Sequence, residues 1–238
     1  MRAHEDLREF VDRPAINFWM GPKAHAVSYL LKGDGYYNIV LICPDNLPEK
    51  VDVASAPAHE IEEFFEGWDP RLRRMIERVT EVSKWRLHNS CEMKSWTHKS
   101  GRFVLLGDAC HATLPYLAQG AAMAVEDGAV LGGLLGKLEH KSQLAGVLKL
   151  YESLRKSRTT RIVQESSHQR QVFHLEDGEE QRRRDRELLS DRVRPGFPNK
   201  WRDPVFRNFL FNYDAAREVE AAWAKFKGEE KPVFRSML

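Results

Sequence analysis

The stretch GRFVLLGDACHATLPYLAQGAAMAVEDGAVLGGLL, residues 101–135, decides how the rest of this chain is interpreted. It starts with a short apolar run, Phe103–Leu106, which predicts a buried strand ending at Gly107 and Asp108. Ligands of α/β proteins bind at the carboxyl ends of strands, and a carboxylate there can accept hydrogen bonds from ligand hydroxyls. Because glycine allows a tight turn at that point, the sequence predicts a ligand site that begins at Asp108.

The second half of the stretch predicts an alanine-rich helix whose first turn has almost no side-chain bulk. Gly120, Ala121 and Ala122 present bare N–H groups, which at a helix N-terminus favour a ligand that carries negative charge. Pro115 fixes the loop before them. On residue types alone a second interpretation is equally open, in which the helix packs tightly on a sheet and Asp108 is only a turn residue.

The composition of the 238 residues is typical of a globular protein. Hydrophobic residues make up 42% of the chain, enough for a sizeable core. Lys and Arg number 37 against 35 Asp and Glu, and this balance provides no general field for nucleic acid or an acidic membrane surface. The three cysteines form no CxxC pair, so we expect a reducing compartment, no disulfide framework and no bound metal.

Neither a signal peptide nor a membrane span is predicted. The first residues are charged and are not followed by the apolar segment of a signal peptide. The best apolar candidate, Gly120–Gly136, is interrupted by Glu126 and Asp127 and falls short of the ~18 residues that a span requires. We therefore expect no membrane partner, no nucleic-acid partner and a cytoplasmic location.

The residues before this stretch predict a β-hairpin. Ala24–Lys32 and Tyr36–Cys43 are β-prone runs on either side of Gly33-Asp34-Gly35, a loop of the kind that joins antiparallel strands. Ile39–Cys43 is apolar without alternation, which predicts a strand buried on both faces.

Short helices and one more strand are predicted around this hairpin. The first ten residues favour a short helix, and residues 58–67 and 70–82 favour two others. The last of these has Asp69 as its expected N-cap, directly before a proline. Residues 83–90 favour a strand.

The residues after the stretch predict a long charged helix and a docked tail. In Leu144–Arg194 acids are mixed with bases, so we expect a solvated, salt-bridged helix face. A nucleic-acid-binding helix around Arg182–Arg184 is the other interpretation of this segment. Pro195–Pro198 ends the helical pattern, and the aromatic tail that begins at Trp201 predicts one helix, Ala215–Phe226.

The stretch 101–135 resembles the second FAD-binding motif of the single-component aromatic hydroxylases, flavin monooxygenases with the para-hydroxybenzoate hydroxylase fold. The pattern is most similar to fungal, salicylate hydroxylase-like members. The matching residues are Arg102, Leu106–His111, Leu114–Tyr116, Gln119–Ala124, Glu126 and Asp127. The resemblance implies an α/β (α+β) chain that corresponds to the C-terminal half of such a monooxygenase.

Three regions follow from this resemblance. Residues 1–95 would form part of the substrate-binding sheet domain. Residues 96–140 would be the C-terminal part of the FAD-binding domain, and residues 141–238 would be the long charged helix and the aromatic tail.

The resemblance also implies roles for residues of the loop and of the helix. Asp108, preceded by Gly107, would bind the ribityl chain of FAD. Pro115 would border the flavin face where oxygen reacts, so it would be both a cofactor-binding and a catalytic residue. The turn Gly120–Ala122 would present N–H groups to the pyrimidine end of the flavin, where a helix N-terminus stabilises the anionic reduced form.

Two neighbours of Asp108 are assigned structural roles. We expect His111 to be a loop residue fixed by hydrogen bonds. We expect Cys110 to be a small buried residue, because no basic partner that would activate the thiol is evident.

The segment Trp19–Tyr29 is similar to the part of the family that enters the substrate-domain sheet. His25 and Tyr29 are an even number of residues apart, which places them on one face of a strand. The resemblance implies that both contact a phenolic substrate over the flavin, with His25 acting as a base because its pKa lies near neutrality. The other interpretation of His25 is a strand histidine bonded to a neighbouring carbonyl.

The function that the resemblance implies is NAD(P)H-dependent hydroxylation of a small aromatic substrate, through a C4a-hydroperoxyflavin. The family's GxGxxG unit, which binds the ADP half of FAD, has no counterpart in these 238 residues. We therefore expect a truncated monooxygenase that retains FAD weakly and has little or no activity alone. The alternative is a non-catalytic remnant or interaction protein that keeps half of the fold, with a second chain or oligomer covering its exposed sheet.

Overall fold

The computed structural model describes residues 1–13, 15–31 and 35–229, and it divides the chain into two compact units. The first unit comprises Met1–Leu87 and Gln171–Arg186, and the second comprises His88–Arg170 and the residues from Glu187 onward. The chain passes between the units within one long helix, α6 (Leu144–Phe173). Each unit has hydrophobic clusters of its own.

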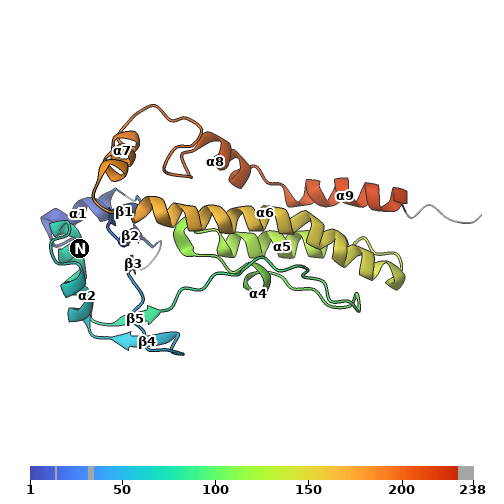
Figure 1. The fold of residues 1–238 in the computed structure, drawn as a ribbon, viewed down its shortest axis with the longest axis horizontal. Helices are drawn as coiled ribbons and strands as arrows, with labels where there is room; N and C mark the ends of the chain where they lie inside the picture. The colour runs from blue at the N-terminus through green and yellow to red at the C-terminus, as the bar shows by residue number, and fades with distance from the viewer. Residues whose placement is uncertain (14, 32–34, 230–238) are drawn as a thin grey trace, which may run out of the picture. The chain divides into compact units, whose positions relative to one another are not determined.

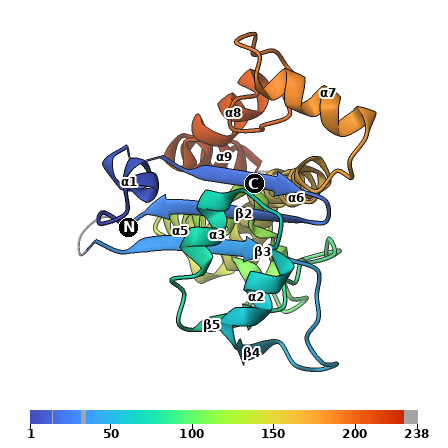
Figure 2. The same ribbon diagram turned by 90° about the vertical axis from the view of Figure 1, so that its left-hand side faces the viewer.

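The first unit is built on a three-stranded antiparallel sheet with short helices. Its elements are α1 (Glu5–Asp12), β1 (Asn17–Gly21), β2 (Ala24–Leu30), β3 (Tyr37–Ile42), β4 (Val53–Ala56), α2 (Ala58–Phe64), α3 (Pro70–Ile76), β5 (Val82–Trp85) and most of α7 (Glu179–Leu188). The strands form the sheet β1-β2-β3 and a separate ladder of β4 and β5. Figure 2 shows α1 and α3 lying over the three-stranded sheet.

The centre of the sheet is β2, which pairs with β1 on one side and with β3 on the other. His25 of β2 lies opposite Met20 of β1 and Ile42 of β3. The predicted hairpin is confirmed by the antiparallel β2–β3 pair, although Lys32, Gly33 and Asp34 of its loop lie outside the described residues. The strand β1 was not predicted from the sequence.

The strand β3 is an edge strand, and the prediction that Ile39–Cys43 is buried on both faces is wrong. Ile39, Val40 and Leu41 are half-buried, and Cys43 is exposed. In the part of the chain that the structure describes, β3 has a hydrogen-bonded neighbour on one side alone. An unbroken apolar run indicates two-sided burial only when the strand lies inside a covered sheet.

The helix α3 begins where the sequence predicts. The Asp69 carboxylate accepts a hydrogen bond from the backbone N–H of Arg71 at 2.8 Å, which confirms it as the N-cap. The guanidinium of Arg71 also binds this carboxylate and lowers the pKa of Asp69 to about 2. Leu72 and Ile76 pack against Ala26 of β2. Both α2 and α3 end several residues earlier than predicted, and β5 is likewise shorter than residues 83–90.

The second unit is mainly helical. Its elements are α4 (Asp108–His111), the 3-10 turn η1 (Pro115–Leu117), α5 (Gly120–Leu135), the 3-10 turn η2 (Lys141–Gln143), most of α6, α8 (Pro204–Phe211) and α9 (Ala215–Glu229). Figure 1 shows α5 and α6 running along each other. Val130 of α5, Tyr151 of α6 and Trp223 of α9 belong to one buried cluster. No helix among the described residues has the length and hydropathy needed to cross a bilayer.

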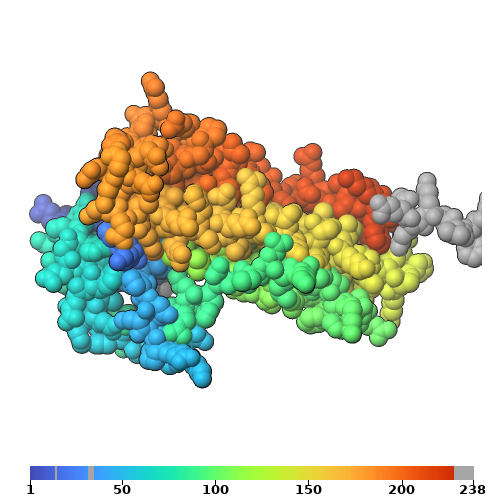
Figure 3. Space-filling view, in the orientation of Figure 1, coloured from blue at the N-terminus to red at the C-terminus, as the bar shows by residue number. Residues whose placement is uncertain are grey.

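The C-terminal tail packs along α6, and it contains two helices where one was predicted. Figure 3 shows the tail, in orange to red, beside α6. Phe206 and Leu210 of the unpredicted α8 pack on Ile162. The Asp203 carboxylate accepts hydrogen bonds from the N–H groups of Val205 and Phe206, so an Asp-Pro start like that of α3 was present in the sequence.

Two further predictions for this part of the chain need correction. The expected strand Phe103–Leu106 makes a single bridge, between Thr97 and Val104, because the described residues offer no further strand for it to pair with. The side chains of Phe103 and Leu106 are consequently 58% and 42% exposed. The long charged helix is also interrupted, since α6 ends at Phe173 and α7 begins after a break.

Candidate functional site

A sharp turn at Gly107 places Asp108 in the wall of a cavity in the second unit. Gly107 has φ 59° and ψ −145°, a conformation essentially restricted to glycine. Asp108 follows directly as the first residue of α4, at the surface of the unit. The glycine is therefore required for the direction that the chain takes at this point.

The cavity has a volume of about 460 Å³ and is lined by small side chains. The lining residues are Asp108, Thr113, Pro115, Ala118, Gly120, Ala121 and Ala124. Four of the residues predicted as cofactor-binding, Asp108, Pro115, Gly120 and Ala121, thus share one cavity. Ala122 is exposed in the first turn of α5 but is not part of the lining.

The open N-terminus of α5 forms one wall of this cavity. The first N–H groups of an α-helix have no acceptor within the helix, and Gln119, the N-cap residue, supplies no side-chain hydrogen bond. The turn Pro115–Leu117 leads to Ala118, which has a left-handed backbone with φ 50°. This geometry leaves the N–H groups at Gly120 and Ala121 available to a ligand with negative charge.

A buried carboxylate, Asp127 of α5, lies behind the Gly107 turn. Its Oδ2 accepts hydrogen bonds from the backbone N–H of Gly107 at 2.9 Å and from His111 Nε2 at 2.6 Å. Its Oδ1 accepts a hydrogen bond from Arg155 Nε at 2.7 Å. Burial opposes ionisation, but the hydrogen bonds from His111, Arg155 and Gly107 outweigh it and hold the pKa of Asp127 below its usual value.

No role for this cluster was expected from the sequence. The sequence does contain one sign of the cluster, the charged pair Glu126–Asp127 within an otherwise apolar helix. Acids buried in such a helix require partners of opposite charge or hydrogen-bond donors. The partners themselves, Arg155 and Arg158, come from α6 and could not be paired with these acids from the sequence.

His111 and Cys110 lie beside the cluster. His111 is held by its hydrogen bond to Asp127, as expected, although it lies in the helix α4 and not in a loop. Cys110 is buried, and burial together with the nearby Asp127 carboxylate raises the pKa of its thiol to about 12. A thiol that stays protonated is not a nucleophile at neutral pH.

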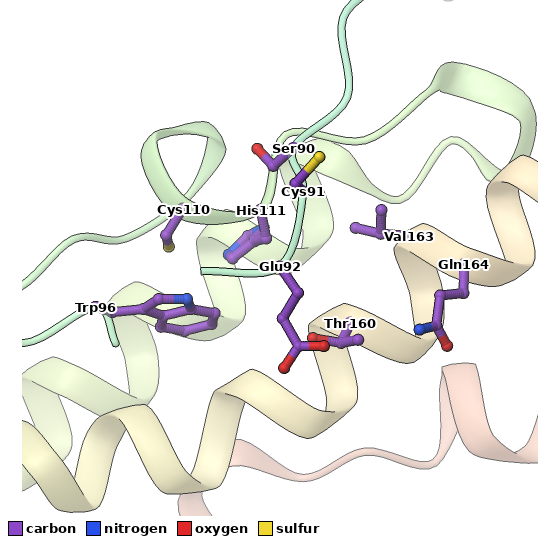
Figure 4. A pocket seen from close by; sticks show the side chains of 9 residues that line it. All are labelled: Ser90, Cys91, Glu92, Trp96, Cys110, His111, Thr160, Val163 and Gln164. Atoms are coloured by element: carbon purple, nitrogen blue, oxygen red, sulfur yellow. The ribbon is translucent and has the colours of Figure 1, made fainter. Parts of the chain in front are cut away.

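A second cavity of about 80 Å³ is lined in part by His111 and Cys110 (Figure 4). The side chains of Glu92, Thr160 and Gln164 and the ring of Trp96 lie around it. Its volume is well below the roughly 300–1,000 Å³ of small-molecule sites.

The predicted substrate-side residues belong to the first unit. His25 is buried in β2, and its Nδ1 lies 2.7 Å from His174 Nε2. Burial and then the neighbouring His174 lower the pKa of His25 to about 3. A neutral imidazole of this kind is a weak base near pH 7. Tyr29 is half-buried on the same strand, opposite Asn38.

Part of the chain matches a family of flavin-binding domains. Residues 55–166 match the FAD binding domain family, and this range includes every residue of the cavity. The resemblance found in residues 101–135 is thereby confirmed.

Curated relatives extend the similarity over most of the chain. The FAD-dependent monooxygenase OpS4 of Beauveria bassiana is 42% identical over 223 residues, which cover 93% of this chain and 52% of that protein. The 3-hydroxybenzoate 6-hydroxylase of Polaromonas naphthalenivorans is 33% identical over 172 residues, which cover 72% of this chain and 42% of that protein. The chain thus spans about half the length of the curated relatives it matches.

Solved structures confirm the predicted fold class. A salicylate hydroxylase in a substrate complex matches with a TM-score of 0.72 at 22% identity. The match covers 87% of this chain and 49% of the salicylate hydroxylase chain. The fold is therefore that of about half of an aromatic hydroxylase.

Proposed function

Because the chain is homologous to the FAD-dependent aromatic monooxygenases over about half of their length, we propose that its second unit holds the flavin ring of FAD for hydroxylation of a small aromatic substrate. The observation that carries the proposal is the cavity shared by Asp108, Pro115, Gly120 and Ala121. NAD(P)H is the proposed reductant. FAD, when bound, would supply the redox chemistry, taking a hydride and passing one oxygen atom of O₂ to the substrate.

The residues around the cavity fit a flavin. Its volume of about 460 Å³ lies within the roughly 300–1,000 Å³ of small-molecule sites. The walls at Ala118, Gly120, Ala121 and Ala124 have little side-chain bulk, so a flat ring can approach the backbone. One carboxylate and one open helix N-terminus supply the polar groups that fix orientation.

Each of these groups has a proposed task that follows from its chemistry. The Asp108 carboxylate would accept hydrogen bonds from the hydroxyls of the ribityl chain. The N–H groups of Gly120 and Ala121, with Ala122 next in the turn, would donate to the pyrimidine end and stabilise its negative charge on reduction. Pro115 would border the reacting face, where its ring keeps the loop in one conformation.

On the substrate side, we propose that His25 and Tyr29 orient the aromatic ring. Their shared strand face supports this, since both side chains then act on one ligand. The low pKa of His25 indicates a neutral hydrogen-bonding group near pH 7 and does not favour proton abstraction. Orientation by hydrogen bonds does not require a strong base.

A non-catalytic interaction protein is the alternative function. The observation in its favour is the exposure of large apolar side chains in the second unit, including Phe103 at 58% and Val125 at 73%. A partner chain would cover them in this alternative. The curated relatives named above are monooxygenases and do not favour it.

The proposal is tested by flavin binding to the full chain. Riboflavin is the sharper probe, because it contains the ring and the ribityl chain but not the ADP half. Asp108→Asn should raise the Kd for riboflavin about tenfold or more, since charge-assisted hydrogen bonds contribute ~1.5–3 kcal/mol each. Asp191→Asn, at an exposed acid of the same unit, is the matched control.

Quenching of riboflavin fluorescence on titration with protein measures the Kd of the wild type and of each variant. Binding that weakens in the Asp108 variant alone supports the proposal. A wild-type chain that quenches neither riboflavin nor FAD refutes the flavin site. Co-purification of a second protein with such a chain would then favour the interaction role.

A further inference from the structure

The carboxylate of Asp127 joins two walls of the flavin cavity. Asp127 lies on α5, whose first turn forms one wall, and it binds the backbone N–H of Gly107, directly before Asp108 in the other wall. It also binds His111 at the end of α4. One fully buried side chain therefore connects the segment that carries Asp108 to the helix that presents the free N–H groups.

The directions of these hydrogen bonds are fixed by chemistry. The Gly107 N–H and the Arg155 guanidinium are donors only, so the Asp127 side chain must accept from both. An ionised carboxylate is acceptor-only, and the lowered pKa of Asp127 keeps it in that form. His111 therefore donates to this carboxylate from Nε2.

The surroundings hold this carboxylate in place. Arg155 is fully buried and binds Asp127 and Glu126, each at 2.7 Å. Glu126 also binds Arg158 at 2.7 Å, so two acids face two guanidinium groups. Gly107 also lies near α5, since a Cβ added at this glycine would be 3.4 Å from the Cβ of Ala124.

From this arrangement we infer that Asp127 is a positioning residue of the flavin site, which sets the placement of Asp108 relative to the N-terminus of α5. The inference rests on the proposed function. Asp127 itself is not among the residues lining the cavity, so it acts through the Gly107 turn.

The test compares three variants of the full chain. Asp127→Asn keeps the size of the side chain but removes its charge and one acceptor. His111→Leu removes one hydrogen bond and leaves the Asp127–Arg155 pair intact. Glu152→Gln is the matched control, because Glu152 also accepts a backbone N–H, that of Thr97 at 2.9 Å, in a loop outside the cavity lining.

Two readouts are measured on folded protein, with folding checked by urea titration. The first is hydrogen–deuterium exchange of the amides of residues 107–112, which requires no flavin. The second is the Kd for riboflavin together with the position of its visible absorption band. A residue that only stabilises the fold would leave the Kd and the band of the folded fraction at their wild-type values.

We expect Asp127→Asn to speed exchange at residues 107–112 and to weaken riboflavin binding, each about tenfold or more, and to shift the band. His111→Leu should weaken binding by about threefold, and Glu152→Gln should change neither readout. If Asp127→Asn does not fold, His111→Leu decides the question. Wild-type exchange and affinity in the folded variants would overturn the inference. A wild-type chain that binds no riboflavin would refute the proposed function, while the exchange data would still decide whether Asp127 holds the turn.

Discussion

Replacement of Arg155 by leucine should destabilise the second unit strongly. Arg155 is fully buried, and its guanidinium binds Asp127 and Glu126 and lies over the ring of Tyr213, 5.0 Å from its centre. In Arg155→Leu the carboxylate of Asp127 remains buried without its cation. Removal of one partner from a buried ion pair costs about 3–5 kcal/mol, a large part of the ~5–15 kcal/mol that stabilises a typical protein.

Urea unfolding followed by circular dichroism measures this loss. With a slope of about 2–3 kcal/mol per molar urea, the midpoint should fall by about 1–2.5 M. The control is Lys137→Met, which removes a cation from the more exposed pair with Glu220, at 2.7 Å. That change should cost about 0–1 kcal/mol.

The pH dependence of the stability loss in Arg155→Leu shows whether the loss comes from a buried unpaired charge or from lost packing. The pKa of Asp127 is lowered in the folded wild type, so its contribution to stability is present above the unfolded pKa and is lost as the pH falls through the folded value. In Arg155→Leu burial favours the protonated acid, so the variant loses less than the wild type on acidification. The difference between the two proteins should therefore shrink from pH 7 toward pH 4. A loss below about 1 kcal/mol, or a difference that does not change with pH, would refute this account of the cluster.

Three other predictions concern the turn, the histidine pair and the cofactor. Gly107→Ala should lower the free energy of unfolding by about 1–3 kcal/mol and weaken riboflavin binding, because a residue with a side chain is strained at φ 59°. Equal urea midpoints for the variant and the wild type would contradict this. The folded pKa of His25, about 3, lies below its ordinary 6.5, so the unfolded chain takes up a proton that the folded chain does not. Stability should fall as the pH drops from 6.5 toward 3, by about 1–2 kcal/mol between pH 7 and pH 5, and His25→Phe should remove this loss in matched urea titrations. The sequence contains no GxGxxG to bind the ADP half of FAD, so FAD and riboflavin should bind with Kd values within about threefold of each other in fluorescence titrations. A hundredfold preference for FAD would instead show an ADP site in this chain.

Local chemistry explains which elements could be predicted from the sequence. The Asp69-Pro70 pair marks a helix start because an N-cap acceptor and a fixed φ act within a few residues. The alanine-rich helix that the sequence predicts forms as α5, Gly120–Leu135, because its glycine- and alanine-rich run has no interior breaker of the strength of proline. The turn at Gly107 likewise depends on one residue type.

Elements that depend on distant partners could not be predicted in this way. Phe103–Leu106 has the composition of a strand, but a strand forms only against a neighbour, and the described residues supply one bridge. Asp127 and Arg155 lie 28 positions apart, and no local pattern pairs them. The positions of Asp108 and Gly120 on one cavity could be expected only from the family resemblance.

Arg158 connects the buried ion-pair cluster to α8. Besides Glu126, its guanidinium binds the carbonyl oxygens of Phe209 at 2.7 Å and Leu210 at 3.1 Å, at the end of α8. During synthesis α5, with Glu126 and Asp127, is translated before α6, which carries Arg155 and Arg158. The two carbonyl groups that accept hydrogen bonds from Arg158 are translated later still. The hydrogen bonds of Arg158 are thus completed only when residues 209 and 210 have been translated, and a nascent chain that stops earlier leaves this guanidinium without two of its acceptors.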